Sequence, residues 1–411
     1  MHKKLRPFLL IIFVAFLFFS LFDFRNSLTA TIYEPLCWWQ TVTADNNTSR
    51  TITWITTEKG TAPFVEYQPP QTNAVIHTTT QEEKIQTDQG MVYRYTATLI
   101  NLEPDTIYRY TIGDGHETSQ TQSFRTGGNG SLKALIFGDS QSSDYTVWGT
   151  TFRNAYHQYN DADLFINMGN LVDNGADWKQ WQQWFAQVKK GSRSIPTAPI
   201  SGNHEDYTYD WHTTIPHLYT NIFQLPDNGP EGLQGRCYYY DYTNVRFIVL
   251  DTQWEELQKF QPDLLKKQVK WLQTILSANP QKWTVVLMHR PPFNTHGNEK
   301  LDQLGELFTP LFEQYGVDVV FTAHTHTYSR TGPLKKSLPA DKGPLYISTG
   351  RSGDKTWQGA RQKSTDLVFD LSLDQPNYII LEANATTLII KNAKQDNKVT
   401  DSVVLIKQPP S

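Results

Sequence analysis

The most constraining feature of the sequence is a set of five short polar islands, each of which follows an apolar, β-rich run. These runs include residues 134–137, 164–168, 284–288 and 317–321, and they are typical of buried strands. Side chains at the carboxyl ends of strands can meet in one crevice of an α/β sheet, so the pattern predicts a common site. The islands are Gly138-Asp139, Gly169-Asn170, Gly202-Asn203-His204-Glu205, His289-Arg290 and Ala323-His324-Thr325-His326.

The islands carry the donor atoms of a metal site. Carboxylate, amide and imidazole groups in this proportion suit two adjacent divalent transition ions such as Zn, Fe or Mn. Such a pair activates water for hydrolysis. Taken singly, each island has a structural explanation: Gly138-Asp139 as a turn, His289 as a core histidine, and His324 with His326 as alternating strand-end side chains. Five such islands in one chain favour the metal site.

In order and composition the islands resemble those of the calcineurin-like metallophosphoesterases, and within them the purple acid phosphatase branch. The family pattern is GD, a second GD, GNH followed by Asp or Glu, a histidine that ends an apolar strand, and GHxH. The resemblance implies one or two transition metal ions, divalent or trivalent (Fe, Zn or Mn). The ligands that it implies are Asp139 and His326 for the first metal, Asn203, His289 and His324 for the second, and Asn170 as the bridge.

Three departures from the family pattern bear on metal occupancy. Asn170 stands where the family has a bridging aspartate, so the cluster has one negative charge fewer and a second ion is harder to hold. Gln141 and Asp173 stand where the family supplies a further histidine or, in the purple branch, a tyrosine. Without that tyrosinate we expect no purple charge-transfer band even if iron binds. Ala323 replaces the first glycine of GHxH, which adds only a Cβ atom.

The remaining polar residues of the islands suggest roles in phosphate ester hydrolysis. His204 is the candidate general acid, because imidazole titrates near the working pH, and Glu205 or Asp206 could orient it. Arg290 can donate a fork of hydrogen bonds to phosphate, and His296 lies on the following loop, where the resembling enzymes place substrate-contacting histidines. Arg290 in a surface ion pair and His296 as a solvated loop residue are the structural alternatives.

Two classes of function stay open from the sequence. The first is an exported metal-dependent phosphoesterase that hydrolyses phosphate esters with a metal-activated hydroxide, weakened by Asn170 in the bridging position. The presence of all four imidazoles supports it. The second is a catalytically impaired binding or adhesion protein of the same fold at the cell surface, which Asn170 and Gln141 support. The sequence does not select among monoester, diester, nucleotide and surface-polymer substrates.

The start of the chain predicts export. Lys3, Lys4 and Arg6 precede an apolar run at residues 8–22, which is short for a spanning helix but suits a signal core. Residues 1–30 are therefore a signal peptide or an uncleaved membrane anchor, and the protein is extracytoplasmic. Outside the cytoplasm the two cysteines, Cys37 and Cys237, could pair or stay as buried thiols. The net charge of -4 and pI near 6.3 argue against a nucleic-acid binder.

The rest of the chain divides into two predicted domains. Residues 31–127 alternate polar and apolar side chains, and residues 101–110 resemble the fibronectin type III-like N-terminal domain of purple acid phosphatases. Residues 131–411 predict an α/β (α+β) domain, a four-layer β-sandwich flanked by helices at 263–276 and 301–315. Trp178, Trp181 and Trp184 have the spacing of a packed helix face. We expect the β-patterned tail, residues 378–407, to complete a second sheet of this domain.

Overall fold

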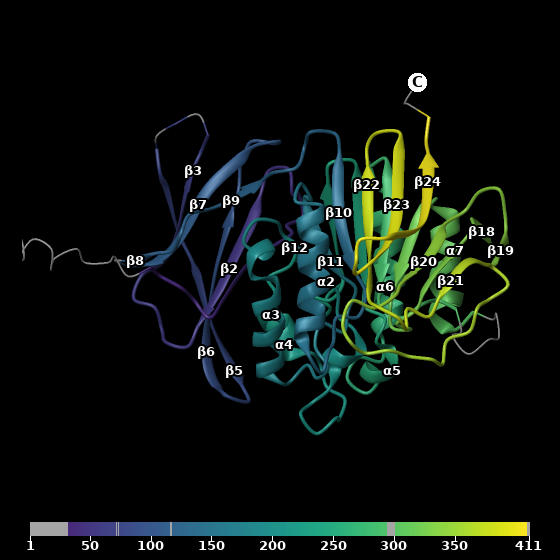
Figure 1. Cartoon of the computed structure of the whole chain (residues 1–411), viewed down its shortest axis with the longest axis horizontal. Coiled ribbons are helices and arrows are strands. Elements are labelled where there is room, and N and C mark those ends of the chain that lie inside the picture. The colour runs from purple at the N-terminus through teal and green to yellow at the C-terminus, as the bar shows by residue number, and fades with distance from the viewer. Residues whose placement is uncertain (1–31, 71, 73, 116, 294–300, 409–411) are drawn as a thin grey trace, which may run out of the picture.

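Two large β-sheets packed face to face form the centre of the molecule, shown here as a computed structural model that describes residues 32–408 except 71, 73, 116 and 294–300 (Figure 1). Helices cover the outer face of each sheet. This order of helix, sheet, sheet and helix confirms the predicted layered α/β architecture.

The first sheet has ten strands and runs through most of the length of the molecule. Three of its central strands are parallel, and they supply the first three polar islands. In order across the sheet, the strands are β24 (Val399–Ile406), β23 (Thr387–Lys394), β22 (Asn377–Ala383), β10 (Leu132–Phe137), β11 (Leu164–Asn167), β12 (Thr197–Pro199), β1 (Cys37–Thr41), β2 (Arg50–Thr56), β6 (Gly90–Leu99) and β5 (Gln81–Thr87).

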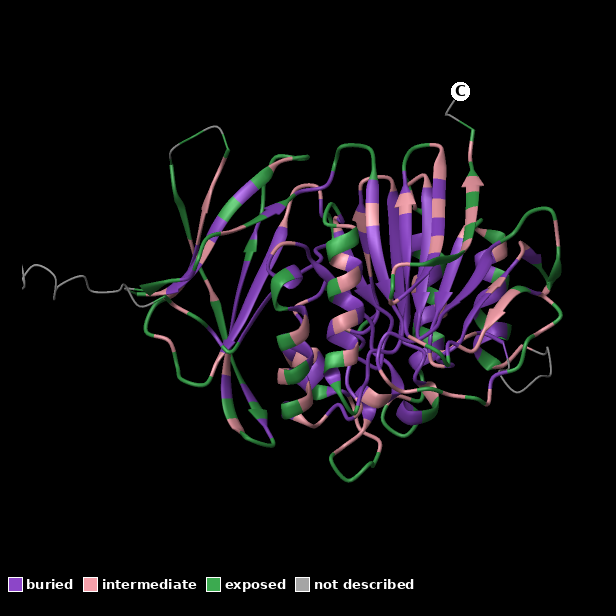
Figure 2. Cartoon of the chain, viewed as in Figure 1, coloured by how far each residue is buried: buried purple, intermediate pink, exposed green. Residues whose placement is uncertain are grey.

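The second sheet has seven strands among the described residues, and its central strands are buried on both faces (Figure 2). In order, they are β13 (Tyr238–Tyr242), β14 (Val245–Leu250), β15 (Trp283–Met288), β16 (Val319–Thr322), β20 (Leu345–Thr349), β17 (Tyr328–Thr331) and β21 (Asp366–Asp370). Side chains of β14 alternate between the two hydrophobic cores: Phe247 and Val249 face the first sheet, whereas Ile248 and Leu250 face the outer helices. A strand that is apolar on both faces is typical of such a central position.

In the part of the chain that the structure describes, four long helices form the outer layers. α2 (Tyr145–Gln158) and α3 (Trp178–Ser192) cover the first sheet, and α6 (Leu264–Ser277) and α7 (Gln303–Gln314) cover the second. Asp177 caps α3 by accepting hydrogen bonds from the backbone of Lys179 and Gln180. Trp178, Trp181 and Trp184 are fully buried on its inner face, as their spacing predicts. The short elements are η1 (Asn203–Asp206), α4 (His217–Ile222), α5 (Trp254–Leu257), β18 (Leu334–Lys335) and β19 (Leu338–Pro339).

The N-terminal part is an all-β sandwich. Its second layer consists of β4 (Ile76–Thr79), β3 (Pro63–Gln68), β7 (Ile107–Asp114) and β8 (Glu117–Thr118), with β9 (Gln122–Arg125) paired to β7. Trp54, Tyr95 and Tyr110 pack between this layer and the ten-stranded sheet. The sandwich confirms the predicted all-β N-terminal domain, while its likeness to a fibronectin type III domain stays a prediction.

The ten-stranded sheet continues from the N-terminal sandwich into the α/β part. β1 pairs with β12 in parallel, with Thr41 opposite Thr197. At the end of α3, the backbone oxygen of Arg193 accepts hydrogen bonds from Gln40 Nε2 and from the Tyr110 hydroxyl, both at 2.7 Å. The guanidinium of Arg193 also lies 4.6 Å from the centre of the Trp38 ring. The division into residues 31–127 and 131–411 stays a proposal, because the two parts share a sheet.

The C-terminal tail corrects one prediction. Its three strands do form, but β22 pairs with β10 in the ten-stranded sheet instead of joining the second sheet. The reason lies in β22, where Ile379, Ile380 and Leu381 are all fully buried. Such a strand needs cover on both faces, and beside β10 it lies between the second sheet and α2.

The structure bears to different degrees on the predictions about targeting and about the two cysteines. Residues 1–30, the predicted signal or anchor, lie outside the described residues. Among the helices that the structure describes, none has the length and apolar character to span a membrane. Cys37 and Cys237 are separate buried thiols.

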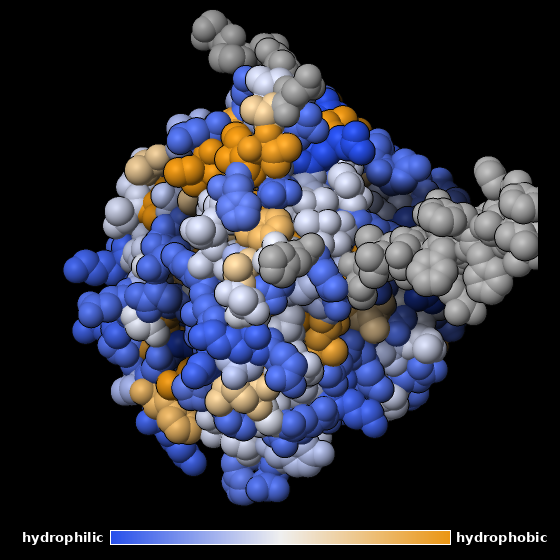
Figure 3. Space-filling view, turned by 90° about the vertical axis from the view of Figure 1, so that its left-hand side faces the viewer, coloured by the Kyte–Doolittle hydropathy of each residue, from blue (hydrophilic) through white to orange (hydrophobic). Residues whose placement is uncertain are grey.

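The end of the molecule at the N-terminal sandwich is mostly hydrophilic, with hydrophobic side chains gathered near the top of that face (Figure 3).

Candidate metal centre

The five islands meet where the carboxyl ends of strands from both sheets come together. Asp139, Asn170 and Asn203 follow β10, β11 and β12 of the first sheet, whereas His289 and His324 follow β15 and β16 of the second. A backbone hydrogen bond from His324 N to Asp139 Oδ1, at 2.9 Å, joins the two sets across the sheets. The convergence of islands that the sequence predicts is therefore present.

Unusual backbone conformations allow the islands to approach so closely. Asn170, His324 and His326 have φ of 51°, 68° and 53°, in the left-handed region, which costs roughly 1–2 kcal/mol per residue. Gly169 has φ of 95°, and a Cβ atom there would lie 2.5 Å from His289 Nδ1. Ala323 is not among the described residues with positive φ, so the alanine in place of glycine is accommodated. Such strain concentrates at functional sites.

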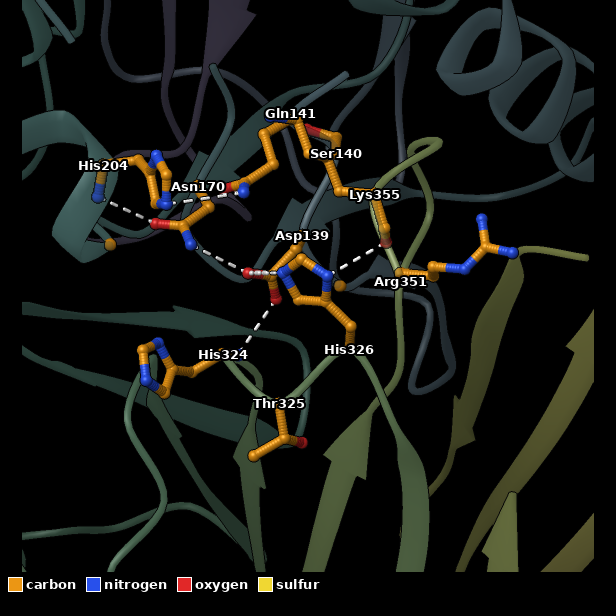
Figure 4. A network of polar contacts seen from close by, with 12 residues as sticks. Asp139, Ser140, Gln141, Asn170, His204, His324, Thr325, His326, Arg351 and Lys355 are labelled. Carbon is orange, nitrogen blue, oxygen red and sulfur yellow. Dashed lines mark hydrogen bonds and ion pairs between the residues drawn. The ribbon is translucent and has the colours of Figure 1, made fainter. Parts of the chain in front are cut away.

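One half of the centre, the Asn203 half, consists of Asn203, His289 and His324. Asn203 Oδ1 lies 3.1 Å from His289 Nε2 and 3.2 Å from His324 Nδ1. The other half, the Asp139 half, consists of Asp139, Asn170 and His326. Asp139 Oδ2 lies 3.1 Å from His326 Nε2 and 2.9 Å from Asn170 Nδ2 (Figure 4).

In the Asn203 half, His289 has the tautomer of a metal ligand. Its Nδ1 lies 2.8 Å from the backbone oxygen of Met168, which can only accept, so Nδ1 carries the proton. Burial lowers the pKa of His289 to about 4, so the ring is neutral and Nε2 presents a lone pair. This lone pair faces the lone pairs of Asn203 Oδ1. Two acceptor atoms 3.1 Å apart, with no proton to share, suit common ligands of one cation.

His324 fits a cation less directly because of Arg290. Arg290 Nη1 lies 3.3 Å from His324 Nε2, and a guanidinium can only donate. This contact favours the tautomer with the proton on Nδ1, the atom that faces Asn203. Arg290 also binds Glu256 Oε1 at 2.5 Å and Gln253 Oε1 at 3.3 Å. Arg290 is therefore held mainly by its ion pair with Glu256 and contacts His324 from there, and its predicted role in phosphate binding stays a prediction.

In the Asp139 half, the protein itself satisfies the carboxylate. His326 Nδ1 donates to the backbone oxygen of Lys355 at 2.9 Å, while Nε2 faces Asp139. Burial lowers the pKa of His326, but the charge of Asp139 outweighs it, and the pKa lies above its ordinary value. Burial likewise opposes ionisation of Asp139, yet His326 holds the pKa of Asp139 below its ordinary value. A buried ion pair is the result.

The orientation of the Asn170 amide is fixed from both ends. Its Oδ1 accepts a hydrogen bond from the backbone N–H of His204 at 3.0 Å, so its Nδ2 is the group that points into the centre. Nδ2 donates to Asp139 Oδ2 at 2.9 Å and to Asn203 Oδ1 at 3.3 Å. A nitrogen donor therefore occupies the place of the bridging aspartate oxygen, and it cannot bind a cation.

Glu205 holds the backbone of the islands in place. Its carboxylate accepts hydrogen bonds from the backbone N–H groups of Asn170, Leu171 and Gly202 at 2.7–2.9 Å. Glu205 is buried, so these donors have no access to water. The expectation that Glu205 orients His204 is thus replaced by a role in fixing the loops. Asp206 is also buried and lies apart from the His204 ring contacts.

His204 lies at the edge of the centre, between the two residues that replace family ligands. Its Nδ1 lies 2.6 Å from the backbone oxygen of Asp173. Its Nε2 lies 3.4 Å from Gln141 Nε2 (Figure 4). Burial lowers the pKa of His204 despite the nearby charge of Asp173. Lys355, which no motif marks, reaches Asp173 Oδ1 with its Nζ at 2.8 Å.

The donor set as a whole fits one transition cation better than two. No three His, Cys, Asp or Glu side chains of the described residues gather closely enough to hold a metal by themselves. The Asn203 half adds an amide oxygen to two imidazoles, and that set suits Zn, Fe or Mn. The Asp139 half offers only Asp139 and His326, already paired. His296, the second predicted phosphate contact, lies outside the described residues.

The sequence is similar to two protein families and to several known proteins. The sequence matches the calcineurin-like phosphoesterase family over residues 132–328 and the N-terminal domain family of purple acid phosphatases over residues 39–126. It is 26% identical over 346 residues to an uncharacterized protein of Mycobacterium tuberculosis, covering 74% of this chain and 63% of that protein. It is 25% identical over 315 residues to purple acid phosphatase 1 of Ipomoea batatas, covering 70% of this chain and 63% of that protein. The chain thus spans less than two thirds of these relatives.

Among solved structures, the fold is similar to that of a purple acid phosphatase from yellow lupin (Lupinus luteus) seeds. The TM-score is 0.77 at 19% identity, with 90% of this chain and 74% of that chain covered. At this identity the likeness shows the fold alone. Together with the two matched families it confirms the resemblance stated from the motifs. The chain is built from a purple acid phosphatase N-terminal domain followed by a calcineurin-like phosphoesterase domain.

Proposed function

We propose that this chain is an exported phosphoesterase that hydrolyses phosphate esters with one transition cation, held by Asn203, His289 and His324. The observation that carries the proposal is the contact between His289 Nε2 and Asn203 Oδ1, two acceptors 3.1 Å apart with the tautomer set by Met168. A bound cation would supply Lewis-acid activation of water and charge compensation on phosphoryl oxygens. Zn, Fe and Mn all suit this donor set.

The protein's own side chains would orient the ester. The contact of His204 Nδ1 with the backbone oxygen of Asp173 fixes the ring, so that Nε2, once protonated, would be the atom that gives a proton to the leaving group. Lys355 is about a third exposed and forms an ion pair with Asp173, the residue that contacts the His204 ring. From there it can compensate charge on the phosphate. Both assignments are part of the proposal, as is the phosphate contact of Arg290.

Turnover of p-nitrophenyl phosphate with Zn, Mn or Fe added to metal-depleted protein tests the proposal. We expect activity that depends on the metal and is lost in His289→Ala. His157→Ala, which removes an exposed histidine of α2, is the matched control and should keep full activity. Metal-independent activity, or equal activity in both variants, would contradict the proposal.

A second candidate function is binding of phosphate esters without turnover. The Asp139 half favours it, because both oxygens of Asp139 are already used by His324 N, Asn170 and His326. A chain of this kind would bind inorganic phosphate in calorimetry while no added metal produces turnover. Turnover above the metal-free background rejects this candidate.

A further inference from the structure

An aromatic pair beside His204 is not used by the proposed chemistry. The ring centres of Tyr207 and Trp211 lie 5.8 and 6.1 Å from that of His204, both nearly perpendicular to it. The two rings also contact each other, at 5.8 Å and an angle of 50°. We call Tyr207 and Trp211 the aromatic wall.

The aromatic wall is held by its loop and yet remains accessible. Tyr207 pairs with Thr213 in an isolated bridge, and Trp211 N donates to Thr208 O at 2.9 Å. The Tyr207 hydroxyl lies 3.5 Å from Glu256 Oε1. Trp211 nevertheless is 54% exposed, although an indole is among the largest apolar groups that a protein can bury.

The backbone of Trp211 is strained in this position. Its φ is 62°, a left-handed conformation that is a genuine outlier for so bulky a residue. Strain of this kind persists where the surrounding structure enforces it, and it concentrates at binding and catalytic sites. A turn alone would be satisfied by glycine or asparagine at this position. Its exposure and its backbone strain together therefore favour a role for the Trp211 indole in binding a ligand.

The position of the aromatic wall beside His204 indicates which part of a substrate it would contact. It flanks the imidazole that, under the proposed function, faces the oxygen leaving the phosphorus atom. The group attached to that oxygen must then lie against Tyr207 and Trp211. We propose that the aromatic wall binds a flat, aromatic leaving group, so that esters of an aryl or similar planar ring are the preferred substrates. This inference rests on the proposed phosphoesterase function and extends it to a substrate class.

The test compares two esters and three variants of the metal-loaded full chain. For 1-naphthyl phosphate, Trp211→Ala should lower kcat/KM by about threefold to tenfold, mainly through KM, because offset or edge stacking is lost, while ethyl phosphate changes by less than about twofold. Trp211→Phe should keep most of the preference. Tyr209→Ala is the matched control: Tyr209 lies on the same loop and is 61% exposed, and its ring is not among the described rings packed around His204.

Binding separates a failure of this inference from a failure of the proposed function. Calorimetry with 1-naphthylmethylphosphonate and methylphosphonate needs no turnover. Tighter binding of the naphthyl compound, lost in Trp211→Ala but not in Tyr209→Ala, supports the aromatic wall even if no ester is hydrolysed. Equal binding of the two phosphonates, or equal loss on both esters in Trp211→Ala, overturns it.

Discussion

In the Asn203 half of the centre, uncharged acceptors face each other at 3.1 Å, whereas in the Asp139 half a carboxylate is matched by a protonated histidine and an amide. Both halves come from the same kind of island at the end of a strand. They differ in how closely the Asn170 amide approaches: it donates to Asp139 Oδ2 at 2.9 Å but to Asn203 Oδ1 only at 3.3 Å. The Asp139 carboxylate is thus satisfied by His326 and the Asn170 amide, whereas in the other half the lone pair of His289 Nε2 faces an acceptor oxygen.

Charge explains why the difference matters. Asp139 and His326 favour each other's charged form, so a cation at that position would have to compete with the imidazole for the carboxylate. The Asn203 half has no charge of its own, and the nearby Arg290 disfavours a cation. We therefore expect one site of moderate affinity rather than two strong ones.

Removing a donor from each half in turn should give the largest contrast. His289→Ala should lower the affinity of the site for Zn²⁺ by more than about 100-fold, since even supporting contacts of a metal site contribute 10–100-fold. His326→Ala, in the other half, should change it far less. Calorimetric titration of metal-depleted protein measures both. Similar losses in the two variants would mean that the halves bind a cation together.

Breaking the support of the islands should destabilise the whole domain. Glu205→Ala leaves buried backbone donors of Asn170, Leu171 and Gly202 without an acceptor. We expect the free energy of unfolding to fall by about 3 kcal/mol in urea titrations. Glu306→Ala, at an exposed position of α7, should change it by less than about 0.5 kcal/mol. A small effect of Glu205→Ala would show that water reaches these donors.

Restoring the bridging charge should make the two halves alike. Asn170→Asp replaces the inward Nδ2 donor by a carboxylate oxygen, so a second cation should bind and the metal content should rise from one toward two per chain. Turnover of p-nitrophenyl phosphate should rise with it. Asn170→Ala removes the donor without adding charge and should leave the content at one. Equal metal content in the Asp and Ala variants would show that charge is not the limiting factor.

Removing the repulsion in the Asn203 half should have the smallest effect. Arg290→Gln takes away a positive charge 3.3 Å from His324 Nε2 and frees the tautomer that binds through Nδ1. We expect Zn²⁺ affinity to rise by about threefold, a modest value because the side chain is partly solvated. Arg290→Lys keeps the charge and should show no such gain. Higher affinity in both variants would point to the shape of the guanidinium instead of its charge.

Local pattern predicted much of this structure. The runs before Asp139, Asn170 and His289 are strands because apolar residues dominate each of them, and strand ends bring islands together whatever the details of the loops. The place of the tail was not predictable in this way. Ile379–Leu381 would be buried equally well in either sheet, and only pairing with β10 decides between them.

Side-chain direction was likewise beyond the sequence. The replacement of aspartate by Asn170 indicates a missing charge, but the direction of its amide depends on the His204 N–H, which only the folded backbone places. The sequence shows that Gln141 and Asp173 stand in the places of family ligands. It does not show that both contact His204, because the three residues lie on three separate loops. Lys355 belongs to no motif, and its contact with Asp173 depends on packing alone.

The most direct test of the account is the number of transition ions that one chain binds. Metal-depleted full-length protein is titrated with Zn²⁺ in a calorimeter, and the metal content after dialysis is measured by mass spectrometry. The account predicts one ion per chain in the unmodified protein, a second in Asn170→Asp, and none retained in His289→Ala. Two ions in the unmodified protein, or none, would contradict it.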